Sequence, residues 1–363
     1  MAKLPSSTEV LVAGAGPTGL TLAALLRAGG TNVVVVDRAP RRSSEARASV
    51  LHSRGIEILD TLGVAGPLLD EGAPINSASY YDAGVEVAEV RFDDLNGVFP
   101  FAVGIGQNRV EAELLERLAD VGTRVHRSAS VEGATDLGDS VNVVVRTAGG
   151  DTQEINAQWL VGCDGASSAI RALVGADGKG EEDLDTFVLA TAQVGGDLDD
   201  TTMHTFCAPE GFCVLSPLPG GVFRLTANMA DSSGTPSVEQ IQAVLNSRGP
   251  RTSSLTLGEP TYVARYKLRR GVATSMRAGR VLLAGDAAHT FSPVGGQGMN
   301  TGLHDAANLA WKISAVCGGA APIRLIETYD PERSRAADET FERTERLAGA
   351  LTESNPLLRG ARD

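Results

Sequence analysis

The sequence predicts an α/β fold with two domains, one built on a parallel sheet and the other, an α+β domain, on a mostly antiparallel sheet. Residues 8–37 read as a strand, a glycine-rich turn, a helix and a second strand. Residues 76–103 and 184–270 carry the alternating pattern that is typical of antiparallel strands. A buried strand followed by long helices returns after residue 280, which restores the first pattern. The length of 363 residues fits about two domains.

The first segment is a βαβ unit of the Rossmann type. Apolar runs at 9–13 and 32–37 read as buried strands on either side of a G-x-G-x-x-G turn formed by Gly14, Gly16 and Gly19. In such a unit the first glycine permits the tight turn, the second lets the backbone approach a pyrophosphate, and the third lets helix and strand pack closely. The pyrophosphate then lies at a helix N-terminus, where unpaired N–H groups favour negative charge.

An acidic residue completes this unit at the tip of its second strand. Asp37 follows Gly19 by 18 positions, close to the spacing of about 20 at which a carboxylate accepts a ribose hydroxyl. The sequence therefore predicts dinucleotide binding, although the unit alone does not separate NAD from FAD. A basic cluster of Arg38, Arg41 and Arg42 comes next, and it is either a solvated loop or a phosphate contact.

Composition excludes several classes of function. A net charge of −13 and a pI of about 4.9 argue against partners that are nucleic acids or anionic membranes. The four cysteines lack metal-binding spacing, so we expect no metal site and reduced thiols in a cytoplasmic protein. Neither an apolar leader nor an apolar run of 18 residues is present.

The middle of the chain supplies two predicted helices. Helical periodicity extends over 46–62, with Arg47 at its start. A second, amphipathic helix is predicted over 104–119, and Gln107 lies near its N-terminus. An exposed arginine is the ordinary interpretation of Arg47.

Two further buried strands end in acidic glycine motifs. The strand at 159–163 leads into Asp164-Gly165, and the strand at 280–284 leads into Gly285-Asp286. A glycine-rich loop with Pro293 follows the second strand, and Gly298-Met299-Asn300 opens a helix to about residue 317. We therefore expect a discontinuous nucleotide domain of residues 1–75, 104–183 and 271–363, and a second domain of 76–103 and 184–270.

Four separated motifs in fixed order carry a family resemblance. They are GAGPTG with Asp37, Arg47 ahead of a helix, CDGASSAIR at 163–171, and LLAGDAAHTFSPVGGQGMNTGLHDAANLAWKI at 282–313. Together they resemble the FAD-dependent aromatic hydroxylases of the para-hydroxybenzoate hydroxylase type, the class A monooxygenases. The sequence of the last motif is most similar to that of bacterial aromatic-polyketide hydroxylases.

The resemblance implies a set of FAD contacts. The glycine turn would hold the pyrophosphate, and Asp37 the adenosine ribose. Arg47 and Gln107 would contact the phosphate and ribityl region, Asp286 the ribitol hydroxyls, and the loop before the last long helix the flavin ring. The residues implied are Gly14, Gly16, Pro17, Gly19, Asp37, Arg38, Arg47, Gln107, Val131, Asp164, Gly165, Gly285, Asp286, Pro293, Gly298, Met299 and Asn300. Val131 is implied through a backbone contact to adenine, and Asp164-Gly165 through contacts to both FAD and the nicotinamide cofactor. No covalent flavin link is expected.

The activity implied is hydroxylation of a phenolic or polyketide-derived ring, with NADPH or NADH, O₂ and a flavin hydroperoxide, in a single-component enzyme. A Baeyer–Villiger oxygenase, a flavin-dependent reductase or desaturase, and a non-catalytic FAD-binding protein remain alternatives. The cofactor carries most of this chemistry, so we assign no catalytic residue. His289 is expected to be structural, while His204 and Arg224 are candidates to line the substrate pocket.

Two departures from larger relatives are expected. We expect this chain to lack their C-terminal thioredoxin-like domain, since it ends at Asp363. The sequence contains no dedicated second Rossmann unit for NADPH, which fits transient surface binding of that cofactor. The chain is expected to be a monomer or a homodimer.

Overall fold

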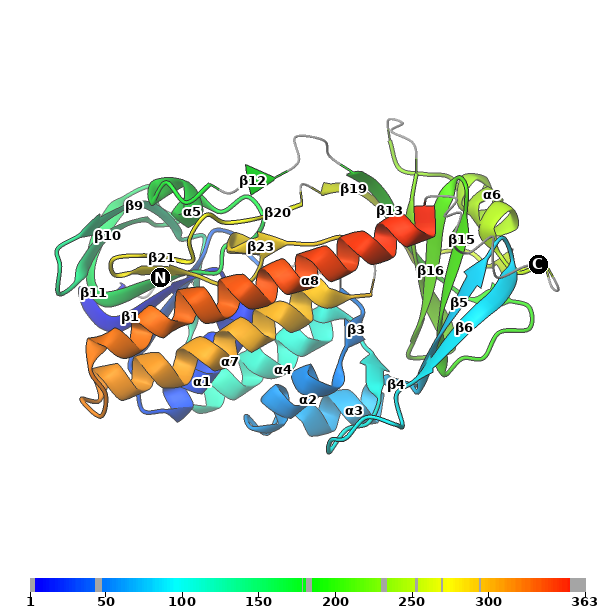
Figure 1. Ribbon diagram of the computed structural model, residues 1–363. Helices are drawn as coiled ribbons and strands as arrows, with labels where there is room; N and C mark the ends of the chain where they lie inside the picture. Colours follow the sequence, from blue (N-terminus) through cyan, green and yellow to red (C-terminus); the bar gives the residue numbers. More distant parts are fainter. Residues whose placement is uncertain are drawn as a thin grey trace.

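The computed structural model describes residues 4–42, 48–177, 179–180, 185–229, 234–251, 254–268, 270–293 and 295–352. Two sheets stand at opposite ends of the molecule, with a layer of long helices against the first (Figure 1). The helix α8 (Tyr329–Thr352) lies beside α7 (Gln297–Cys317) and reaches from the first sheet toward the second. Within the described ranges, no helix is long and apolar enough to cross a membrane.

The first sheet has a parallel core. Its strand order is β21-β22-β11-β1-β2-β8, with β10 and β9 added antiparallel beside β11. The bounds are β1 (Ser7–Ala13), β2 (Val33–Asp37), β8 (Val125–Arg127), β9 (Ser130–Asp136), β10 (Val141–Arg146), β11 (Thr152–Gly162), β21 (Arg277–Ala278) and β22 (Val281–Leu283). The helices α1 (Pro17–Ala28), α4 (Gln107–Asp120) and α7 pack against one another over this sheet.

Burial on both faces explains why these strands are nearly continuous apolar runs. In β1, Val10, Leu11 and Val12 are all completely buried, and each pairs in parallel with β11. A parallel sheet covered by helices needs apolar side chains on both faces, and β-branched residues fit its pleat. The predicted Rossmann-like α/β class is confirmed.

The second sheet is antiparallel except for one pair. Its strand order is β19-β13-β17-β16-β15-β5-β6, and β15 runs parallel to β5. The bounds are β5 (Ser77–Asp82), β6 (Val85–Arg91), β13 (Asp185–Ala192), β15 (Thr202–Ala208), β16 (Gly211–Leu218), β17 (Val222–Asn228) and β19 (Tyr262–Leu268). One face packs on α6 (Val238–Arg248), whose N-terminus has a capping box of Ser237 and Gln240.

A third, small sheet contacts the second sheet, and its first strand lies where a helix was predicted. The helix predicted over 46–62 begins only at Ser53, as α2 (Ser53–Asp60), because β3 (Val50–Leu51) pairs with β7 (Ala102–Gly104). β7 also pairs with β4 (Ala73–Ile75). Pairing with a distant strand overrides the local helical pattern here. The division into two domains at the expected boundaries stays a prediction.

The remaining elements are short. They are α3 (Ala65–Glu71), α5 (Ala169–Leu173), β12 (Lys179–Gly180), β14 (Val194–Gly195), β18 (Thr256–Leu257), β20 (Gly271–Val272), β23 (His289–Thr290) and the 3₁₀ helices η1 (Gly285–Ala287) and η2 (Ile323–Thr328). Of these, η1 and β23 matter most for the site, because they connect the first sheet to the loop before α7.

Candidate active site

A cavity of about 410 Å³ lies between the first sheet's loops and one face of the second sheet. We call the first sheet with its helices the first lobe, and the second sheet with α6 the second lobe. The first lobe contributes the N-termini of α1, α4 and α7 and the turns at Gly165 and Asp286. The second lobe contributes side chains from five neighbouring strands. They are Leu189, Met203, Val214, Ser216, Thr226 and Tyr266.

The N-terminus of α1 opens into this cavity. Its first residue is Pro17, and Gly16 at the N-cap has no side chain to satisfy the first N–H groups. A Cβ built on Gly16 meets no atom within 4 Å, so this side of the turn is open. Gly14 is held differently: its φ is +109° and a Cβ there would lie 2.2 Å from the Cys163 carbonyl oxygen. A Cβ built on Gly19 would lie 2.1 Å from the Gly14 carbonyl oxygen, so this position is equally close-packed.

The N-terminus of α7 opens into the same cavity. Gly296 is its N-cap and also provides no capping side chain, while Gly298 and Met299 in the first turn line the cavity. A Cβ on Gly298 would meet only an Asp286 carboxylate oxygen, at 3.9 Å. Two uncapped helix N-termini thus place unpaired N–H groups and positive dipole ends at one cavity. This arrangement fits a ligand with negative charge on a pyrophosphate and, once it is reduced, on a flavin ring, as in FAD.

Asp37 lies outside the cavity wall, at the end of β2. Its carboxylate accepts from the Ala15 N–H at 2.6 Å and the Ala39 N–H at 2.7 Å, and Arg127 approaches at 3.5 Å. The Asp37 carbonyl accepts from the Ala129 N–H at 2.9 Å, just before β9 begins.

Val131 and Arg38, which are also implied to contact the cofactor, lie in the same neighbourhood. Val131 lies two residues beyond Ala129, buried in the β9–β10 ladder and not on the cavity. Arg38 is exposed beside Asp37. Arg47, which is implied for the phosphate and ribityl region of FAD, lies outside the described residues. The cofactor contacts of Asp37, Arg38, Arg47 and Val131 therefore stay predictions.

The structure separates the two residues of the Asp164-Gly165 motif. Gly165 lines the cavity, whereas the Asp164 carboxylate accepts from the Ser168 hydroxyl at 2.5 Å and the Ala169 N–H at 2.7 Å. These contacts hold the start of α5, so the observed role of Asp164 is to organise the turn. Gln107, at the start of α4, lines the cavity and donates to Glu111 at 2.9 Å.

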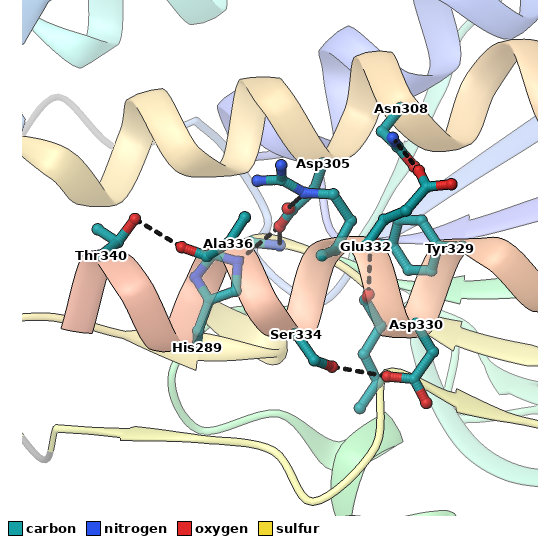
Figure 2. A network of polar contacts seen from close by, with 12 residues as sticks. His289, Asp305, Asn308, Tyr329, Asp330, Glu332, Ser334, Ala336 and Thr340 are labelled. Carbon is teal, nitrogen blue, oxygen red and sulfur yellow. Dashed lines mark hydrogen bonds and ion pairs between the residues drawn. The ribbon is translucent and has the colours of Figure 1, made fainter. Parts of the chain in front are cut away.

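The Gly285-Asp286 turn is fixed from behind by Asp305 of α7. The Asp305 carboxylate accepts from the Gly285 N–H at 2.8 Å, from His289 Nε2 at 2.6 Å and from Arg333 Nε at 2.6 Å. Figure 2 shows Asp305 between His289 and the first turns of α8. Asp286 itself is exposed and lines the cavity wall.

Burial and charge act in opposite directions on Asp305. Burial alone would raise the pKa of its carboxyl, but the imidazole of His289, the Arg333 guanidinium and the Gly285 N–H outweigh burial and lower that pKa. The side chains of His289 and Asp305 are both fully buried. His289 therefore acts as a hydrogen-bonded support of the turn, stacked on Phe291 with ring centroids 4.9 Å apart.

The loop before α7 also differs in detail from the implied contacts. Pro293 lines the cavity, and its carbonyl accepts from the Gly296 N–H at 3.1 Å. The Asn300 side chain turns away from the cavity and donates to the carbonyl oxygens of Val50 at 3.0 Å and Gly296 at 2.9 Å. Asn300 thus holds the loop before α7 through its side-chain amide.

The two faces of the second sheet have different neighbours, the cavity on one side and α6 on the other. Phe187, Met203 and Val214 form a core cluster on the cavity side, while Val188, Phe206 and others pack toward α6. His204 is on the α6 side of β15: its Nε2 lies 2.9 Å from the Asp199 carbonyl oxygen and its ring stacks on Phe206.

Arg224 is also absent from the cavity wall, although it faces the cavity side. It pairs across the ladder with Ser216, donates to Thr191 Oγ1 at 2.8 Å, and lies over the Tyr262 ring at 5.2 Å. His204 and Arg224, the candidates from the sequence, are thus not wall residues, and the residues that do form the wall had no sequence signal. The strands are apolar on both faces, so period-two alternation gave no signal for the wall.

Comparisons with known proteins agree with this geometry. A family model described as FAD binding domain matches residues 7–344. The chain is 35% identical over 332 residues to 6-methylpretetramide 4-monooxygenase of Streptomyces rimosus, covering 90% of this chain and 59% of that protein. It is 31% identical over 368 residues to anhydrotetracycline monooxygenase of the same species, covering 98% of this chain and 72% of that protein.

The similarity extends to solved structures. The anhydrotetracycline hydroxylase OxyS from Streptomyces rimosus matches with a TM-score of 0.79 at 31% identity, covering 98% of this chain and 71% of that one. The first of the two curated relatives is thus considerably longer than this chain, which spans 59% of its length.

Proposed function

Because this chain belongs to the FAD binding domain family, we propose that it is an FAD-dependent monooxygenase that hydroxylates an aromatic ring with NAD(P)H and O₂. The observation that carries the proposal is the single cavity shared by the N-termini of α1 and α7 and by a largely apolar sheet face. One side of that cavity suits an anionic dinucleotide and the other suits a ring.

The residues of the first lobe would bind and orient FAD. The α1 N-terminus would hold the pyrophosphate, and Asp286 would accept from ribitol hydroxyls. The first N–H groups of α7 would face the pyrimidine end of the flavin, where positive potential favours negative charge. Bound FAD supplies the redox and oxygen-transfer chemistry, while the protein positions the ring and excludes water.

The opposite wall supports an aromatic substrate with phenolic or carbonyl oxygens. Leu189, Met203 and Val214 give an apolar surface that a flat ring can cover. Ser216 and Thr226 supply hydroxyl groups that can donate to, or accept from, ring oxygens. We propose an electron-rich, polyketide-derived aromatic as the substrate class, since two relatives are named for tetracycline-type compounds.

The proposal is tested on the purified protein. We expect a yellow protein with one FAD per chain that denaturation releases, because no covalent link is expected. Reduction by NADPH followed by ¹⁸O₂, with anhydrotetracycline or phenol as the probe, should give a product that carries one labelled hydroxyl. A colourless protein that gains no absorbance with FAD would refute FAD binding. A labelled lactone or ester would favour a Baeyer–Villiger oxygenase, and oxidised flavin with unlabelled product a reductase or desaturase.

A preference for NADPH over NADH is a separate prediction. Arg38, Arg41 and Arg42 are exposed beside Asp37, and Arg42 donates to the Asn108 carbonyl at 2.5 Å. Arginines in such a cluster can pair with a 2′-phosphate, which NADH lacks. The double change Arg41→Ala with Arg42→Ala should raise the KM for NADPH by about tenfold and leave the KM for NADH nearly unchanged. Equal increases for both cofactors would contradict a phosphate contact.

We also propose that the protein acts in the cytoplasm as a monomer or homodimer, without nucleic-acid or membrane partners. The acidic composition and the lack of a membrane-spanning helix among the described residues support this proposal.

A further inference from the structure

A histidine outside the cavity wall holds the glycine loop that precedes α7. His52 lies between β3 and α2, and its Nε2 is 2.9 Å from the Gly295 carbonyl oxygen, across 243 positions of sequence. A carbonyl oxygen only accepts, so Nε2 carries the hydrogen and donates. Burial lowers the pKa of the His52 imidazole, while the bond to Gly295 opposes that change.

Asn300 completes the contact from the other side. Its Oδ1 accepts from the backbone N–H of His52 at 2.8 Å, and its Nδ2 donates to the Gly296 carbonyl at 2.9 Å. The carbonyl oxygens of both Gly295 and Gly296 are therefore held by side chains, one from the β3–α2 junction and one from α7. We call His52 and Asn300 the loop clamp.

The loop needs this clamp because two of its glycines adopt a conformation that glycine reaches easily but does not prefer. Gly295 has φ of +78° and Gly296 has φ of +61°, both left-handed. Glycine populates left- and right-handed regions about equally, so local sequence does not fix either torsion. Since α7 begins directly after Gly296, these torsions set the direction in which its first N–H groups point.

The clamp is adjacent to the cavity without being part of its wall. Gly295, Gly296 and Gln297 line the cavity, whereas His52 and Asn300 do not. A Cβ on Gly296 would lie 3.8 Å from His52 Nε2, so the imidazole backs directly onto the loop. Residues of this kind act on a ligand only through the groups that they hold in place.

We propose that His52 is a positioning residue for the flavin. By donating Nε2–H to the Gly295 carbonyl it fixes the left-handed glycine pair and so aims the N–H groups of α7 at the cofactor. The proposal rests on the proposed function only in that FAD occupies the cavity.

The experiment measures FAD affinity of the apoprotein by quenching of flavin fluorescence, with the apoprotein melting temperature and the bound-flavin absorption spectrum recorded alongside. His52→Leu should weaken FAD binding by about tenfold, the loss of one hydrogen bond with its ordering effect, and should alter the flavin spectrum. His52→Gln should restore affinity and spectrum, because the glutamine Nε2 reaches as far and donates.

A matched control comes from His204, which makes the same imidazole-to-carbonyl contact at the same 2.9 Å on the side of β15 away from the cavity. His204→Leu should lower the melting temperature and leave FAD affinity and spectrum unchanged. If His52→Leu does not fold, His52→Gln and His52→Asn replace it: only the longer amide should bind FAD like the wild type.

Wild-type affinity and spectrum in His52→Leu, or equal binding by the Gln and Asn variants, would overturn the positioning role. A loss in His204→Leu as large as in His52→Leu would also overturn it, because stability would then explain both. Failure of the wild-type apoprotein to bind FAD would instead contradict the proposed function.

Discussion

Replacement of Gly298 by valine is expected to weaken FAD binding strongly while leaving the fold intact. Gly298 is the second residue of α7, and a Cβ there meets only Asp286 Oδ1 at 3.9 Å, so the apoprotein has room for the new side chain. The same room is the space that we assign to the flavin ring. Overpacking of about 1–3 kcal/mol corresponds to a loss of affinity of roughly fivefold to 150-fold. Titration of the apoprotein with FAD measures this loss.

Gly66 offers a matched control for this change. It is the second residue of α3, a Cβ there meets no atom within 4 Å, and it is not among the residues that line the cavity. Gly66→Val should therefore bind FAD like the wild type, which separates the steric effect from helix propensity. Normal FAD binding and turnover by Gly298→Val would contradict the placement of the flavin at the α7 N-terminus.

His289→Ala provides a second comparison for the Gly298 variant. Since His289 supports the Gly285-Asp286 turn from behind, its loss should reduce turnover less than Gly298→Val does. FAD content, NADPH oxidation and product formation should be measured for both. If His289→Ala bound FAD normally yet abolished hydroxylation, while Gly298→Val stayed active, the assignment of the chemistry to flavin and backbone would be wrong.

Replacement of Asp305 by alanine is expected to cause the largest loss of stability. The change leaves the buried His289 and the Arg333 guanidinium, whose side chain is 12% exposed, without their carboxylate. Removing one partner of a buried charged pair typically costs about 3–5 kcal/mol. The free energy of unfolding, measured with urea, should fall by about this amount, and FAD affinity should fall because Gly285 loses its acceptor.

Glu339 provides the control, because it forms an ion pair with Arg335 on the same helix as Arg333, but at exposed positions. Glu339→Ala should change the free energy of unfolding by less than about 1 kcal/mol, as is usual for exposed pairs. An Asp305→Ala variant as stable as Glu339→Ala would show that the buried network does not hold the fold.

Lowering the pH should also weaken the hydrogen-bonded network around Asp305. The folded-state pKa of Asp305 is lowered, so its ionised form stabilises the protein above the unfolded-state value of about 3.9. That contribution is lost as the pH falls from there through the lowered folded-state pKa. The free energy of unfolding of Asp305→Asn should therefore depend less steeply on pH in this range than that of the wild type.

Much of the nucleotide lobe could be predicted because its requirements are local. Gly14 and Gly16 lie between a strand and a helix, and Gly19 lies in the first turn of that helix, so spacing alone indicates a turn that approaches a ligand. The same is true of Gly285-Asp286 and of the glycines before α7. In each case a backbone constraint fixes the residue type at a position that the sequence itself displays.

The cavity's opposite wall and its supports were decided by the tertiary structure. The strands around Leu189 and Val214 are apolar on both faces, so only the packing of α6 determines which side chains face the cavity. The prediction of a helix over 46–62 was wrong at Val50, because this residue pairs with a strand at 102–104 that is far away in sequence. His52 and Gly295 are 243 positions apart, and no local pattern links an imidazole to a carbonyl over that distance. Local sequence specifies which backbone conformations are allowed, whereas long-range hydrogen bonds and packing select the one that forms the site.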